Sequence, residues 1–331
     1  MKKYLALIFL IVIFSASAFA VSDTNLVGWW KLDEATGNAI DYKGFDNNCS
    51  NTSLTQGSAG IIGNSYTYSA SSSLSDCGSG NLNIVGKISI SAWIYPTTFA
   101  NDEGYVINRV AVGNVMQYRI KDQDWSKSDG KPIFTIGSSG GDVSVSSSIA
   151  MQANKWNFVV ATWDGTSNAN GMKIYVNGNL GAQGTWNAGT QDTTTNSTKF
   201  GISGLGNGAF TGRLDEVGIW SNRVLSTQDI TDLNNSGVGV TYCGYGDYDS
   251  NFMSTCTKTA DPCAPTLNAN WVVTSALDCN SKTISLGTGR LVLSTGGKLR
   301  LFSSTLTAKG WDINASGSSL TLGSGSWIKV G

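Results

Sequence analysis

The stretch GRLDEVGIW, residues 212–220, has the pattern of a buried β-strand that carries two adjacent carboxylates. Because successive side chains of a strand point to opposite faces, Asp215 and Glu216 are expected on different faces of the sheet. We expect Asp215 to face inward, where a carboxylate needs a partner to replace its lost hydration. Glu216 is expected to be hydrogen-bonded or solvated on the other side. The pattern leaves three roles open for the pair: catalysis, metal binding or structure.

The rest of the sequence has the composition of an all-β sandwich or barrel. Glycine accounts for 40 of the 331 residues and only 14% are charged, while short apolar runs are separated by polar, turn-forming residues. The clearest strand candidates are KISISAWIY (87–95), WNFVVATWD (156–164) and MKIYVNG (172–178). One helix is predicted within residues 224–237, where Ser226 and Asp229 have the spacing of a capping box.

The first twenty residues (1–20) are predicted to be a signal peptide. Lys2 and Lys3 precede an apolar run over residues 4–14, and residues 18–20 supply the small side chains of a cleavage site. The run is shorter than the roughly 20 apolar residues that a transmembrane helix needs. We therefore expect an extracellular or cell-surface protein with no membrane span after cleavage.

The cysteine and histidine counts limit the chemistry of the chain. It has no histidine, so Ser-His-Asp and Cys-His mechanisms are excluded. Six cysteines follow the signal peptide: Cys49, Cys77, Cys243, Cys256, Cys263 and Cys279. An even number in an exported chain without Cys-x-x-Cys predicts disulfides rather than a zinc site. We expect Cys49 to pair with Cys77 and the other four to pair among themselves. The formal net charge of −1 argues against nucleic acid as a partner.

The last quarter of the chain differs from the rest in its cysteine and proline content and in its sequence repeats. Residues 238–270 hold three cysteines and two prolines and are predicted to form a Cys-rich linker. Beyond it, residues 289–309 and 310–330 align as two repeats, which resemble rungs of a parallel β-helix over 271–331. A small hairpin subdomain is the alternative.

The end of the chain offers no polar cap for a last rung. A solenoid rung buries its apolar face only against a neighbouring rung, and the final stretch SSLTLGSGSWIKVG (318–331) leaves its apolar side chains uncovered. We expect the mature chain to self-associate through residues 289–331, and a 21–240 fragment to stay monomeric.

Four segments, in this order, resemble the laminin-G-like jelly rolls of the concanavalin A-like lectin/glucanase superfamily. They are LVGWWKLDEATGNAIDYKG (26–44), ISISAWIYP (88–96), NKWNFVVATWDG through MKIYVNG (154–178) and FTGRLDEVGIWSNRVLSTQDITDL (210–233). The resemblance covers residues 24–237 and implies a jelly-roll sandwich of two curved antiparallel sheets. Members of this superfamily usually bind glycans or proteins, while some relatives are hydrolases or lyases.

The resemblance also implies a structural calcium ion. An acidic residue at the position of Asp215 resembles a calcium ligand of this superfamily, and the loop DYKG (41–44) would complete the site with Asp41 and the carbonyl of Gly44. Carboxylate and carbonyl oxygens are the ligands that calcium prefers. The alternative is that Asp215 accepts hydrogen bonds from the backbone or from Arg213, with no metal.

Catalytic candidates are few. Glycosidases usually need two carboxylates, and the mature chain holds only Glu34, Glu103 and Glu216 as glutamates. A lyase would need a tyrosine beside a basic residue, for which Tyr118 and Arg119 are conceivable. We expect no enzyme activity, and keep a glycoside hydrolase or polysaccharide lyase of this fold as the alternative.

Binding is the favoured class of function, and exposed aromatic rings are its usual instruments. Trp125 and Trp186 stand in polar, loop-like stretches and are the predicted ligand-binding residues. The sequence therefore predicts a secreted or cell-surface, non-enzymatic module for carbohydrate binding or adhesion, whose partner is a glycan or a cell-surface protein. A purely structural surface protein is the second alternative.

Overall fold

The computed structural model describes the chain from residue 21 to residue 330, with gaps. The gaps are residues 45–46, 70, 100–103, 111–114, 125–126, 203–207, 245–250, 255–262, 264–267, 269, 274–275, 281–282, 287, 289, 296, 303, 313–318 and 324–325. The predicted signal peptide, Trp125 and Cys256 lie outside the described residues.

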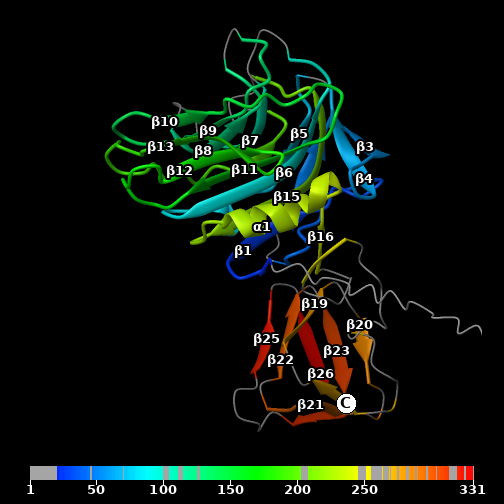
Figure 1. The fold of residues 1–331 in the computed structure, drawn as a ribbon. Helices are drawn as coiled ribbons and strands as arrows, with labels where there is room; N and C mark the ends of the chain where they lie inside the picture. The colour runs from blue at the N-terminus through cyan, green and yellow to red at the C-terminus, as the bar shows by residue number, and fades with distance from the viewer. Residues whose placement is uncertain are drawn as a thin grey trace, which may run out of the picture.

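Two antiparallel sheets form a sandwich, which confirms the predicted jelly-roll fold (Figure 1). The larger sheet has the order β13-β12-β11-β6-β15-β4-β3, and β1 pairs with β15. Its strands are β1 (Leu26–Trp30), β3 (Thr55–Ala59), β4 (Asn64–Tyr68), β6 (Ile88–Pro96), β11 (Asn157–Trp163), β12 (Met172–Val176), β13 (Asn179–Gly184) and β15 (Gly212–Ser221). We call this the helix-side sheet, because the helix described below packs on it.

The second sheet has seven strands in the order β10-β9-β8-β7-β14-β5-β2. They are β2 (Ser50–Thr52), β5 (Leu74–Asp76), β7 (Tyr105–Val110), β8 (Met116–Lys121), β9 (Ile133–Ile136), β10 (Val143–Ser146) and β14 (Lys199–Phe200). A short 3-10 turn, η1 (Gly80–Leu82), follows β5. We call it the seven-stranded sheet.

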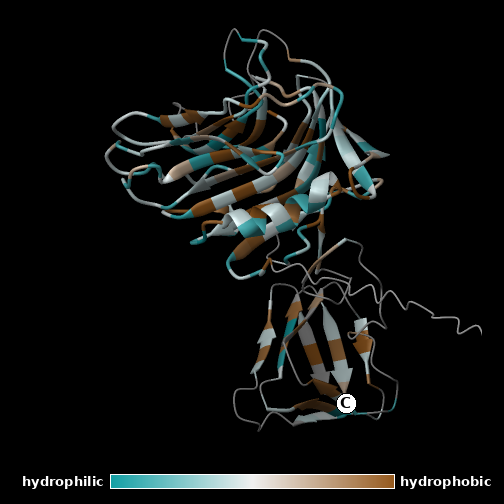
Figure 2. Ribbon diagram, viewed as in Figure 1, coloured by the Kyte–Doolittle hydropathy of each residue, from teal (hydrophilic) through white to brown (hydrophobic). Residues whose placement is uncertain are grey.

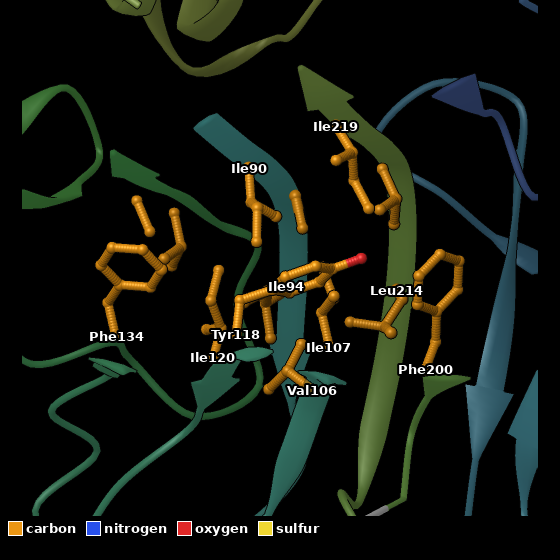
Figure 3. Close-up of a cluster of buried hydrophobic side chains, with 14 of the residues drawn as sticks. Ile90, Ile94, Val106, Ile107, Tyr118, Ile120, Phe134, Phe200, Leu214 and Ile219 are labelled. Carbon is orange, nitrogen blue, oxygen red and sulfur yellow. The ribbon is translucent and has the colours of Figure 1, made fainter. Parts of the chain in front are cut away.

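The core between the sheets comes from the alternation that the sequence predicts. Ile90 and Ile94 of β6 meet Ile107 of β7 and Ile120 of β8 in one buried cluster (Figure 3). Figure 2 shows the same alternation as brown and pale bands along the strands. Trp93, the neighbour of Ile94, points to the opposite face and is buried too. Both faces of the helix-side sheet are therefore covered.

The one α-helix among the described residues, α1 (Thr227–Asn234), covers the outer face of the helix-side sheet (Figure 1). The predicted capping box is present: the Asp229 amide donates to Ser226 Oγ at 3.1 Å, and the Ser226 amide donates to Asp229 Oδ2 at 2.8 Å. The helix ends in the 3-10 turn η2 (Asn235–Gly237). The buried side chains that join α1 to the sheet form what we call the outer cluster; they include Leu225, Ile230, Leu233, Trp29, Trp93, Phe158 and Trp220.

The predicted linker 238–270 begins as a packed hairpin. Strands β16 (Thr241–Cys243) and β17 (Asn251–Met253) pair antiparallel. The Phe252 ring lies 5.0 Å from that of Trp29 and 6.2 Å from that of Trp220, centroid to centroid. Aromatic packing thus attaches this part of the chain to the jelly roll, a contact that linker composition does not reveal.

The C-terminal strands pair in parallel, in three sheets of three. The sheets are β18 (Trp271–Val273), β21 (Arg290–Leu293) and β24 (Gly310–Asp312); β19 (Ala276–Asn280), β22 (Lys298–Phe302) and β25 (Ser319–Leu322); and β20 (Thr283–Ser285), β23 (Thr305–Ala308) and β26 (Trp327–Val330). Leu299 faces Leu320, one repeat further along. The β-helix interpretation of this segment stays a prediction.

Disulfides join residues within each half of the chain. Cys49 is bonded to Cys77, the pairing that we expected, and Cys263 is bonded to Cys279. Cys243 is disulfide-bonded as well. In the described part of the chain, no helix is long and apolar enough to cross a membrane.

Candidate functional site

Strand β15 has a β-bulge at the position of its two carboxylates, Asp215 and Glu216. Asp215 is aligned with Trp93 of β6, whereas Gly218 is aligned with Ser91, so two residues of β15 stand opposite one residue of β6. Glu216 has a φ of 46°, and a left-handed residue of this kind marks a bulge. The expectation that the carboxylates point to opposite faces is therefore wrong, because it assumed unbroken alternation.

Both carboxylates are fully buried and lie on the side of the outer cluster, where Asp215 is aligned with Trp93 and Glu216 contacts Trp29, so Asp215 does not face the inter-sheet core as expected. Asp215 Oδ2 accepts the amides of Ile61 at 2.7 Å and Ile62 at 3.2 Å, and Oδ1 accepts the amide of Glu216 at 2.9 Å. Glu216 Oε2 accepts the indole N–H of Trp29 at 2.6 Å. Burial, followed by the charge of Glu216, raises the pKa of Asp215 well above its usual value. Burial also raises the pKa of Glu216 to about 8.

The other predicted calcium ligands lie in the loop before β2. Asp41 Oδ1 accepts the amides of Trp29 at 3.1 Å and Lys43 at 3.0 Å, and Oδ2 accepts the side-chain amide of Asn47 at 3.0 Å. The amide of Gly44 donates to the Asp41 carbonyl at 3.0 Å. N–H donors thus surround both carboxylates. Among the described residues, no group of three Asp, Glu, Cys or His side chains could hold a metal. Calcium stays a prediction.

The seven-stranded sheet carries an unbroken line of polar residues across its outer face. Strand pairing places these residues side by side from one edge to the other: Ser144, Thr135, Arg119, Asn108, Lys199, Asp76 and Ser50. We call them the polar row. Tyr118 and Ile120, which flank Arg119, lie in the core, so the row faces away from the core.

Hydrogen bonds organise the middle of the polar row. Thr135 Oγ1 lies 2.8 Å from Ser144 Oγ, and the side-chain amide of Asn108 donates to the Ile202 carbonyl at 2.5 Å. Lys199 Nζ lies 3.8 Å from the Asp76 carboxylate. Asn108 and Thr135 are fully buried although they point away from the core. The accessible part of the row therefore consists of the half-buried Arg119, Lys199 and Asp76 and the exposed Ser144 and Ser50.

Family comparison agrees with this fold. The family described as the concanavalin A-like lectin/glucanases superfamily (Laminin_G_3) matches residues 63–231, about half of the chain. The chain belongs to this family. No curated protein matches the sequence significantly.

Two solved structures share the fold of this laminin-G-like domain at low sequence identity. One is the binding domain of Paraclostridial Mosquitocidal Protein 1, with a TM-score of 0.51 and 19% identity; the match covers 65% of this chain and 53% of that one. The other is domain 4 of a GH43 extracellular arabinanase from Geobacillus stearothermophilus in complex with arabinotriose. It has a TM-score of 0.50 and 17% identity, and the match covers 63% of this chain and 97% of that one. This chain thus spans only about half of the toxin domain.

The two predicted ligand-binding tryptophans do not contribute to this surface. Trp125 lies outside the described residues. Trp186 is 9% exposed and packs in the core of the laminin-G-like domain, 5.0 Å from the ring of Trp163. The expectation of an exposed ring at Trp186 came from its polar sequence neighbours, which did not reveal that the side chain turns inward.

The candidate catalytic residues are also dispersed. Tyr118 points into the core, where its hydroxyl donates to the Leu82 carbonyl at 3.0 Å and burial raises its pKa to about 12. Arg119 points to the opposite face, so the sheet separates the conceivable lyase pair. Glu34 Oε2 accepts the Tyr66 hydroxyl at 2.8 Å, and burial raises its pKa.

Sequence reasoning missed the polar row. Only the alternation of Gln117, Arg119 and Lys121 with apolar neighbours signals it. The other members come from six further strands, and their alignment depends on the register of the whole sheet.

Proposed function

We propose that the laminin-G-like domain is a non-enzymatic carbohydrate-binding module that uses the polar row. Sugars present many hydroxyls, and a site for them needs several convergent donors and acceptors on a rigid support. The polar row offers the half-buried guanidinium, ammonium and carboxylate groups of Arg119, Lys199 and Asp76 and the exposed hydroxyls of Ser144 and Ser50 on one sheet. This continuous row is the observation that carries the proposal.

The similarity to an arabinanase domain in complex with arabinotriose supports the proposal, because that domain has this fold over 97% of its length. At 17% identity the similarity concerns the fold, so the sugar and the contacting residues do not transfer. The proposal names a class of ligand and no particular sugar.

The proposed setting is extracellular or the cell surface. The predicted signal peptide and the disulfides Cys49–Cys77 and Cys263–Cys279 support it, since disulfides persist in oxidising compartments. There the domain would attach its chain to a glycan, as a free lectin or as an adhesive module, and calcium at Asp215 would stabilise it. A hydrolase, a lyase and a purely structural role remain the alternatives.

A glycan array probed with the full mature chain tests the proposal. We expect binding to at least one saccharide, with competition by the same free saccharide. Lys199→Glu reverses a charge within the polar row and is expected to weaken binding. Lys173→Glu is the matched control, because Lys173 is a half-buried lysine of β12 in the other sheet. No binding to any saccharide, or an equal loss in both variants, would refute the proposal.

A further inference from the structure

Arg119 stands out within the polar row because its guanidinium has almost no acceptor. The side chain is half-buried, its guanidinium lies 5.3 Å from the centre of the Tyr105 ring, and Nη1 donates only a long 3.4 Å hydrogen bond to the Tyr105 hydroxyl. Its Nε is buried and has no hydrogen-bond partner. Among the described residues, no carboxylate forms an ion pair with Arg119.

The three other arginines of the jelly roll differ from Arg119 in their acceptors, although the Nε of Arg109 is also buried without a partner. Arg109 donates to the Thr194 carbonyl at 2.8 Å, and Arg213 donates to the Ala59 carbonyl at 2.6 Å. Arg223 lies 2.8 Å from the Asp229 carboxylate. Each has a carbonyl or carboxylate acceptor, so the lack of one at Arg119 is not a general feature of the structure.

The charges around Arg119 do not compensate for it. The carboxylate of the polar row belongs to Asp76, which lies beside Lys199, and Asn108 stands between Lys199 and Arg119. Lys121, two residues along β8, is buried, has interactions of its own, and its charge acts on Asp122. Removing a guanidinium from water without an acceptor costs free energy, and an anion bound at this point would offset that cost.

We infer that Arg119 binds the carboxylate of an acidic sugar, so that the ligand of the polar row is an acidic glycan. This inference rests on the proposed carbohydrate-binding function and narrows it to one ligand class. A guanidinium matches a carboxylate through two parallel hydrogen bonds. The Tyr105 ring holds the guanidinium from one side, while the half-buried Lys199 and the exposed Ser144 of the same row provide polar groups for the sugar ring.

Matched pairs of saccharides test the inference with the full mature chain. Each pair has one skeleton and differs only in charge: oligogalacturonate against its methyl ester, and a sialylated glycan against the methyl ester of its sialic acid carboxyl. We expect binding to an acidic member, at least about tenfold weaker binding to its neutral counterpart, and a decline in affinity with added salt. Arg119→Gln should remove the preference for the acidic member, and Arg119→Lys should retain part of it.

Arg213→Gln is the matched control, because Arg213 is also half-buried and stacked on a tyrosine, Tyr95, at 3.8 Å. This variant should keep the acidic preference, and melting temperatures of all three variants report whether they fold. Equal binding to neutral and acidic members would overturn the acidic-sugar inference and leave carbohydrate binding standing. Binding to no member of any pair would overturn both.

Discussion

The bulge at Asp215 and Glu216 explains how one strand accommodates two buried carboxylates. Hydrogen-bond donors from the backbone and from Trp29 replace water around them, because a buried carboxylate without partners would cost several kcal/mol. These donors account for both oxygens of Asp215 and for Oε2 of Glu216, whereas Glu216 Oε1 is buried without a hydrogen-bond partner.

The proposed calcium site predicts a change in thermal stability. Chelator is expected to lower the melting temperature of the wild-type protein, because an ion that binds only the folded state stabilises it by mass action. Asp215→Asn should abolish this sensitivity. Calorimetry with and without chelator measures both effects. An unchanged wild-type melting curve would leave the amide hydrogen bonds of Ile61 and Ile62 as the full explanation of Asp215.

Asp122 predicts a dependence of stability on pH. Its carboxylate accepts the Gly104 amide at 2.8 Å, and burial raises its pKa to about 7, although the charge of Lys121 opposes this. The folded state therefore binds a proton more tightly than the unfolded state, and stability falls as pH rises from about 4 to about 7. The loss would be at most about 4 kcal/mol, because one pKa unit corresponds to about 1.4 kcal/mol.

The Asp122→Asn variant isolates this contribution, since the amide does not titrate. Denaturant unfolding of both proteins between pH 4 and pH 7 measures the difference. The stability of the variant relative to wild type should rise across this range. Parallel curves would show that Asp122 has the same pKa in the folded and unfolded states.

At the scale of elements, both its capping box and its packing on the sheet stabilise the helix α1. Its capping box satisfies the first turn, and Arg223 holds Asp229 at 2.8 Å. Ile230 and Leu233 face the outer cluster, which fixes the helix on the sheet. The helix was predictable because its signals lie within a few residues of one another.

Ser226→Ala is expected to destabilise the domain by about 1 kcal/mol, the usual cost of losing an N-cap side chain. The variant removes the acceptor of the Asp229 amide while leaving the buried face of α1 unchanged. Thr227→Ala is the control, because Thr227 is exposed and only its backbone carbonyl accepts a hydrogen bond. Urea midpoints compare the two variants. An equal shift for both would show that the cap contributes nothing specific.

At the scale of the whole molecule, β24, β25 and β26 are each paired with a strand of the preceding repeat, and among the described residues no strand pairs with their other edges. Trp311 is 42% exposed and Leu322 is 48% exposed. Open strand edges with exposed apolar side chains favour further pairing. We therefore keep the prediction that the mature chain self-associates through residues 289–331.

Sedimentation velocity of two chains tests this prediction. The full mature chain should form oligomers as its concentration rises, whereas a fragment of residues 21–262 should remain monomeric. The fragment must extend past residue 240, because the β16–β17 hairpin covers Trp29 and Trp220 through Phe252. A monomeric full chain would contradict the prediction.

The sequence by itself indicated the strands β6, β11, β12 and β15, the helix and the family resemblance, because period-2 alternation, capping spacing and ordered motifs are local signals. It could not determine the bulge at Glu216, which depends on the register between β15 and β6. Nor could it show that Trp186 is buried or that Arg119 lies between Asn108 and Thr135. These features arise when strands distant in sequence align, so only the tertiary structure decided which side chains share the candidate site.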